Sequence, residues 1–215
     1  MVGKYVRKDL NMPLSLPRRQ GAPDSFYKDC PLTQVGETQA LLLGKALCTA
    51  EVSLQHVYCS PSLRSLQTCR GILRGLLQDE TTPIALEPGL FEWLAWYTDA
   101  MPQFMTPKEM TEAGFRLKDE HQYFVDFSEL TDRRESAEQY YMRSHYVVQS
   151  VLRTTQHIGT YPKFKQTSPH CTIDPKKLVV TDKRLYSLYN NSFKFTFIRV
   201  IAESEYLPCF KFCII

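Results

Sequence analysis

Hydrophobic residues recur at helical spacing in three stretches of the chain, and each stretch predicts a helix. Thr33 is placed to cap the first helix, which runs to about Cys48. Its expected buried side consists of Val35, Leu42, Leu43, Ala46 and Leu47. The second helix begins at Pro61 after Ser60, and its core positions are Leu63, Leu66, Leu73 and Leu76. The third spans residues 135–155, with Tyr140, Tyr141, Val147, Val148 and Val151 on or near one face.

Short apolar runs between these helices predict strands at residues 57–59 and 84–87. The order helix, strand, helix, strand favours a mostly parallel sheet covered by helices, which is an α/β fold. In such a fold the functional site lies beyond the carboxyl ends of the strands. Arg64 follows the first strand and falls at such an end.

The remaining segments read as loops. Residues 1–30 are polar and interrupted by proline, so we expect Arg18 and Arg19 to be solvated rather than to rim an anionic site. Residues 99–135 are irregular, with a short helix near 107–113, and form either an inserted lobe or ordinary surface loop. Ser192 to Ile201 partly alternates and predicts a further strand.

Charge divides the chain near residue 156. The 215 residues carry a net charge of +3, which is too small to indicate a nucleic-acid partner. Residues 1–156 hold 17 Lys and Arg against 19 Asp and Glu, whereas residues 157–215 hold 9 against 4. This shift predicts a domain over 1–156 and a basic tail of separate character over 157–215.

The cysteines are seven, an odd number, and are scattered without any C-x-x-C pair. This usage favours reduced thiols in a cytoplasmic or nuclear protein over a disulfide framework. No metal-ligand spacing is visible among the histidines and cysteines, so we expect no metal. We also expect no membrane partner, because no stretch is apolar enough to span a bilayer.

The junction at Ser60 to Arg64 is suited to bind an anion. Ser60 is placed to cap the helix, and Pro61 fits the first helical position. A helix N-terminus offers free N–H groups, and a guanidinium in the first turn adds a two-pronged donor for phosphate. The alternative is that Arg64 is a solvated surface residue.

The sequence of this junction resembles the signature motif of a known family. Residues 60–68, Ser-Pro-Ser-Leu-Arg-Ser-Leu-Gln-Thr, resemble the Ser-Pro-x-x-Arg-x-x-Gln-Thr signature of the histidine phosphatase (phosphoglycerate mutase-like) superfamily. With residues 11–13, 15–17 and 87–93, the sequence looks like the phosphatase domain of the Sts/TULA ubiquitin-associated and SH3 domain-containing proteins. The resemblance covers roughly residues 3–156 and implies a three-layer sandwich with a mostly parallel sheet.

The resemblance also implies site roles. Arg64 matches the phosphate-binding Arg, and Glu92 matches the general acid that protonates the leaving oxygen. The alternative for Glu92 is a surface carboxylate beside two core tryptophans. The family forms a phosphohistidine without metal or cofactor. Its Arg-His-Gly-Glu and Ala-His-Ala motifs do not occur in these 215 residues, and we expect the central first strand and the last catalytic strand to be missing.

The five histidines have surroundings unlike those motifs, so we expect none to be the nucleophile: His56, His121, His145, His157 and His170. The resemblance implies a protein tyrosine phosphatase that acts in T-cell receptor type signalling. It also implies phosphotyrosine proteins as partners and a homodimer as the assembly. This chain is expected to be inactive and truncated at both ends. The alternatives are a phosphate-binding pseudophosphatase or dimerisation module, and a fragment that does not fold.

Overall fold

The structure is a computed structural model that describes residues 4–130, 134–156, 198–201 and 209–214. Its α-helices are α1 (Gln34–Thr49), α2 (Leu63–Gly75), α3 (Pro107–Glu112) and α4 (Ala137–Gln156). Its strands are β1 (Ser53–Cys59), β2 (Ile84–Leu86), β3 (Ile198–Ile201) and β4 (Cys209–Ile214). Single 3₁₀ turns lie at η1 (Asp24–Phe26), η2 (Pro88–Leu90), η3 (Leu94–Trp96) and η4 (Phe127–Glu129). The three long helices and the strands β1 and β2 therefore lie close to their predicted positions.

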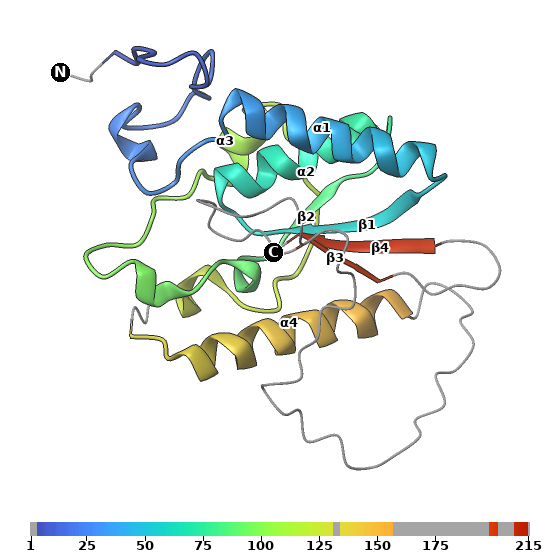
Figure 1. Ribbon diagram of the computed structural model, residues 1–215. Coiled ribbons are helices and arrows are strands. Elements are labelled where there is room, and N and C mark those ends of the chain that lie inside the picture. The colour runs from blue at the N-terminus through green and yellow to red at the C-terminus, as the bar shows by residue number, and fades with distance from the viewer. Residues whose placement is uncertain (1–3, 131–133, 157–197, 202–208, 215) are drawn as a thin grey trace.

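The four strands form one sheet in the order β2-β1-β4-β3 (Figure 1). β1 runs parallel to both β2 and β4, whereas β3 is antiparallel to β4. Tyr58 is opposite Ala85 on β2 and Cys213 on β4. The expectation of a mostly parallel sheet is met. Of the strand predicted over 192–201, residues 198–201 form β3 and the rest lie outside the described residues, while β4 was not predicted.

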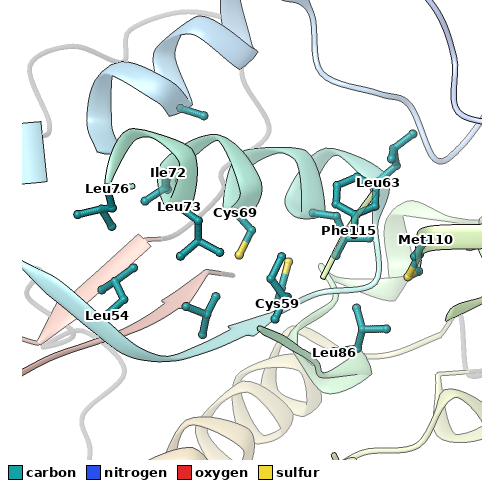
Figure 2. Packing of buried hydrophobic residues seen from close by; sticks show 14 of the residues in the cluster. Leu54, Cys59, Leu63, Cys69, Ile72, Leu73, Leu76, Leu86, Met110 and Phe115 are labelled. Carbon is teal, nitrogen blue, oxygen red and sulfur yellow. The ribbon is translucent and has the colours of Figure 1, made fainter. Parts of the chain in front are cut away.

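Helices cover both faces of the sheet. α1 and α2 lie on one side and α4 on the other (Figure 1). Val57 and Cys59 join the core under α2, whereas Tyr58 joins the core under α4, because successive strand side chains point to opposite faces. The α2 side of the sheet is filled by leucines and sulfur-bearing residues, as Figure 2 shows. All four predicted core leucines of α2 are buried: Leu63, Leu66, Leu73 and Leu76.

The buried side of α1 differs from the prediction. Thr33 caps the helix as expected, because its hydroxyl accepts the N–H of Gly36 at 3.1 Å. The buried residues are Ala40 and Gly44, however, and Leu43 and Leu47 are partly buried. Val35, Leu42 and Ala46 are exposed, so their assignment to the core was wrong. The physical reason is that α1 meets α2 backbone to backbone, where only small residues fit.

α2 begins two residues later than predicted. Ser62, not Ser60, precedes the helix, and its side chain makes no capping hydrogen bond. The N–H of Leu63 instead donates to the Asp29 carboxylate at 2.8 Å. A carboxylate from a distant loop thus takes the place of the local cap, and Arg64 becomes the second helical residue.

The other segments agree in outline with the sequence. The helix expected near 107–113 is α3, which begins with a reciprocal capping box between Thr106 and Glu109. In α4, Val147 and Val151 are buried, whereas Tyr141, which the pattern placed on or near the same face, is exposed. No helix among the described residues is both long enough and apolar enough to cross a membrane.

Candidate functional site

Arg64 and Glu92 meet at the carboxyl end of the parallel strands. Arg64 lies in the first turn of α2 after β1, and Glu92 follows β2 between the turns η2 and η3. Arg64 Nη2 donates to Glu92 Oε1 at 2.5 Å, with the two side chains 24% and 13% exposed. Burial by itself would lower the pKa of Arg64, but Glu92, Tyr97 and Asp29 together outweigh burial and raise that pKa. The structure thus brings together the two residues that the sequence singled out.

Tyr97 is the third member of this cluster. Its hydroxyl donates to the same oxygen of Glu92, Oε1, that receives Arg64. The residue is 6% exposed, and its ring lies 5.3 Å from that of Phe91. Burial, and then the hydrogen bond to Glu92, raise the pKa of Tyr97 well above its usual range. Tyr97 is therefore a neutral hydrogen-bond donor at physiological pH.

Behind Arg64 lies a buried ion pair, in which Arg19 Nη1 contacts Asp29 Oδ2 at 3.0 Å. The Arg19 side chain is 2% exposed and that of Asp29 is fully buried, so the expectation that Arg19 is solvated was wrong. Arg19 is held inside by Asp29 and by the ring of Phe26, 4.7 Å from its guanidinium carbon. Burial raises the pKa of Asp29, against the opposing effects of the Leu63 N–H, Arg19 and Arg64.

Glu87 fixes the turn that leads to Glu92. It is fully buried at the end of β2 and accepts three backbone N–H groups, from Gly89, Phe124 and Val125, at 2.8–3.1 Å. His121 Nε2 lies 3.4 Å from the same carboxylate. Glu87 therefore acts as a structural anchor that holds η2 against the loop at 124–125.

Arg143 on α4 holds the same segment from the other side. Its guanidinium donates to the carbonyls of Gly89 and Phe91, both at 2.8 Å. It also pairs with both oxygens of Glu135, at 2.8 Å and 2.9 Å. Glu135 in turn accepts the N–H of Leu94 at 3.0 Å. The backbone on both sides of Glu92 is thus fixed by one buried ion pair.

Sequence reasoning identified Arg64 and Glu92 but missed their supports. Asp29 and Arg143 belong to no local motif and reach the site through contacts far apart in the sequence. Tyr97 lies close to Glu92 in sequence but outside the motif that contains it. Polar residues inside aromatic stretches, such as Tyr97 after Trp93 and Trp96, were the signal available. Among the residues that the structure describes, no three His, Cys, Asp or Glu side chains gather as metal ligands would.

A cation and a carboxyl group in one part-buried cluster are suited to handle a phosphomonoester. The guanidinium can bind phosphate oxygens, and the carboxyl group can give a proton to a leaving oxygen. This arrangement agrees with the family resemblance of the motifs around Arg64 and Glu92, which the comparisons with known proteins test directly.

The curated relatives include proteins named as phosphatases and proteins named for ubiquitin-associated and SH3 domains. The chain is 49% identical over 154 residues to the ecdysteroid-phosphate phosphatase of Drosophila melanogaster, a match that covers 71% of this chain and 20% of that protein. It is 40% identical over 151 residues to mouse ubiquitin-associated and SH3 domain-containing protein B, with 70% and 24% coverage. The chain thus spans about a fifth to a quarter of the length of these relatives.

A solved structure shares the fold. It is the silkworm (Bombyx mori) ecdysone phosphate phosphatase in complex with tungstate, with a TM-score of 0.65 and 38% identity. The match covers 72% of this chain and 59% of that one. The α/β fold expected from the resemblance is therefore confirmed in part. Residues 20–158 match the histidine phosphatase superfamily (branch 1). The chain belongs to that superfamily.

Proposed function

We propose that this chain supplies the phosphate-binding and proton-donating part of a phosphomonoesterase site. Arg64 binds phosphate oxygens, and Glu92 is the acid that protonates the leaving oxygen. The observation that carries the proposal is the 2.5 Å contact of Arg64 with Glu92 at the carboxyl end of β1 and β2. Support comes from membership of the histidine phosphatase superfamily.

The nucleophile of the family is not present in this sequence. The motifs Arg-His-Gly-Glu and Ala-His-Ala do not occur among the 215 residues. His121, the histidine beside Glu87, is part of a structural anchor and belongs to neither motif. We therefore propose that the 215-residue chain binds phosphate without hydrolysing phosphomonoesters, as a pseudophosphatase does.

The substrate class proposed first is phosphotyrosine in proteins, by analogy with the Sts/TULA resemblance. With it we propose a role in tyrosine-kinase signalling and a homodimer as the assembly. A second candidate is a steroid phosphate. It is favoured by the 49% identity to a protein named ecdysteroid-phosphate phosphatase. Both are phosphomonoesters, so both need the same Arg64 contact, and they differ in the group that carries the phosphate.

The test of the site is whether the 215-residue chain binds phosphate, as measured by titration calorimetry. We expect measurable binding of inorganic phosphate that Arg64→Ala weakens about tenfold or more, because a charged, part-buried donor is lost. Arg74→Ala is the matched control, since Arg74 is an exposed residue of the same helix. Equal affinity in the Arg64 and Arg74 variants would refute the proposed role of Arg64.

The test of activity is p-nitrophenyl phosphate turnover by the same samples. We expect none above background. Turnover that Arg64→Ala abolishes would overturn the pseudophosphatase proposal and show that another residue acts as nucleophile. Competition of phosphotyrosine and ecdysone phosphate against inorganic phosphate then ranks the two substrate classes, and the tighter competitor identifies the class.

A further inference from the structure

The two contacts that meet on Glu92 set up a competition for Arg64. Glu92 Oε1 accepts from Arg64 Nη2 at 2.5 Å and also from the Tyr97 hydroxyl. Both contacts are donors toward one oxygen, so both stabilise the carboxylate in this position. Tyr97 itself is held in place, because it is 6% exposed and packs on Phe91.

A phosphate dianion cannot simply be added to this arrangement. The guanidinium that would bind it is already engaged by Glu92, and the carboxylate and the dianion would repel each other at close range. Binding is therefore favoured when Glu92 leaves Arg64, loses its negative charge, or does both. The contact from Tyr97 opposes each of these changes, since it favours the charged carboxylate in its present place.

We propose that Tyr97 is a positioning residue that holds the Glu92 carboxylate on Arg64 until an anion binds, and that anion binding is coupled to protonation of Glu92. This proposal rests on the proposed function of Arg64 and Glu92. In the exchange, the N–H···O contact from Arg64 to Glu92 breaks and one from Arg64 to the anion forms. Glu92 takes one proton from solvent, and Tyr97 keeps its own.

The exchange would leave Glu92 protonated, as a general acid must be before it protonates the leaving oxygen. A carboxyl group that protonates a leaving oxygen must carry a proton when substrate is bound. In the free site Glu92 acts only as an acceptor toward Arg64 and Tyr97. The arriving dianion would both displace Arg64 from Glu92 and place negative charge beside it, which favours the protonated form. Anion binding and protonation of Glu92 would then occur together.

The charged and titratable groups around Glu92 are known for each neighbouring element. α2 contributes Arg64, the segment after η3 contributes Tyr97, and Asp29 lies on the far side of Arg64. From α4, Arg143 Nη2 lies 3.4 Å from the backbone carbonyl oxygen of Glu92. Also on α4, Tyr140 has a pKa raised mainly by burial and, to a smaller extent, by the charge of Glu92. When Arg64 turns to an anion, Asp29 loses part of the favourable charge that Arg64 supplies, and Glu92 loses its direct contact with Arg64.

The experiment uses sulfate as the probe, because it is tetrahedral like phosphate and keeps its double charge across the neutral range. Calorimetry on the 215-residue chain, in two buffers of different ionisation enthalpy, gives the affinity and the number of protons taken up. We expect proton uptake on sulfate binding, and tighter binding at about pH 5.5 than at about pH 7.5. Binding without proton uptake at any pH would overturn the coupling.

Tyr97→Phe tests the positioning role. Removing the hydroxyl frees Glu92 to leave Arg64, so sulfate should bind about threefold to tenfold more tightly at about pH 7.5. Tyr141→Phe is the matched control, since Tyr141 is 62% exposed on α4, and it should leave the affinity unchanged. Unchanged or weaker binding by Tyr97→Phe overturns the proposal, weaker binding because it would make Tyr97 a ligand of the anion.

Glu92→Gln completes a double-mutant cycle with Tyr97→Phe. It also tests the coupling by itself if Tyr97→Phe does not fold. It should bind sulfate more tightly than the wild type and take up no proton, and adding Tyr97→Phe to it should change nothing further. An effect of Tyr97→Phe that persists in the Glu92→Gln background would overturn the proposal. If the wild type binds no sulfate, or Arg64→Ala binds it equally well, the proposed function itself has failed.

Discussion

Arg143 is the single residue on which the backbone around Glu92 depends most. It donates to the carbonyls of Gly89 and Phe91 while pairing with Glu135, whose side chain is 8% exposed. Removing one partner of a buried ion pair leaves the other charge without compensation, and that loss is larger than the gain from the intact pair. The pair therefore specifies where Glu92 lies more than it adds to the overall free energy of folding.

Replacing Arg143 by methionine should lower the free energy of unfolding by about 3 kcal/mol. Urea unfolding followed by tryptophan fluorescence measures this, because Trp93 lies next to the affected segment and its indole N–H donates to the Glu135 carbonyl. Arg153→Met is the matched control on the exposed side of the same helix and should change little. Equal midpoints for the two variants would contradict the role given to Arg143.

At the scale of single residues, local sequence motifs predict the residues proposed to bind and protonate the substrate. They do not predict the residues that position them. Arg64 and Glu92 lie in motifs whose residues are adjacent in sequence. Asp29 and Arg19 act through burial, and nothing in a proline-rich polar loop indicates that a carboxylate there will reach the N–H of Leu63. Only the folded chain brings these charges to the same place.

At the scale of elements, α1 and α2 pack closely because small residues line both helices where they meet. A Cβ on Gly44 would lie 2.1 Å from the Ile72 carbonyl oxygen, and one on Gly75 would lie 2.4 Å from that of Leu41. Both are backbone atoms, which cannot move aside as a side chain can. The pairing therefore positions the start of α2, and with it Arg64, relative to α1.

The hydrophobic pattern of α1 predicted a leucine-rich buried side, and the small residues explain why it was misleading. Val35 and Leu42 are 52% and 56% exposed. A close helix contact buries backbone and small side chains, which carry a weak hydrophobic signal. For α2 the same method succeeded, because that helix also faces the sheet and buries large side chains there (Figure 2).

Gly44→Ala should therefore lower the free energy of unfolding by about 2 kcal/mol, since the helices must move apart to admit one methyl group. Gly36→Ala is the comparison in the same helix, where the added Cβ meets the flexible end of Leu32 at 3.3 Å. It should be neutral or stabilising by up to about 1 kcal/mol, because alanine favours a helix more than glycine does. Thermal unfolding of both variants measures the difference, and equal losses would contradict close backbone packing.

At the scale of the whole molecule, the chain contributes a strand from its carboxyl-terminal part to the sheet that carries the site. β4 pairs with β1 from Ser53 to Cys59, on the side opposite to β2. The sequence predicts that an α/β sheet exists, but parallel pairing between segments so far apart cannot be read from local patterns. Neither β4 nor its pairing with β1 was predicted from the sequence.

Deleting residues 157–215 should leave one edge of β1 without a partner, because β4 supplies the pairing there. Exposed strand edges destabilise a sheet and template association between chains. We expect a chain of residues 1–156 to unfold at lower urea than the full chain and to elute partly as larger species in size-exclusion chromatography. Hydrogen exchange localises the effect: the β1 amides that face β4 should lose protection, whereas those that face β2 should keep more of it. The full chain under identical conditions is the control. Equal protection of β1 in both chains would show that β4 does not stabilise this edge in solution, and the sheet would then depend on β2 and the helices alone.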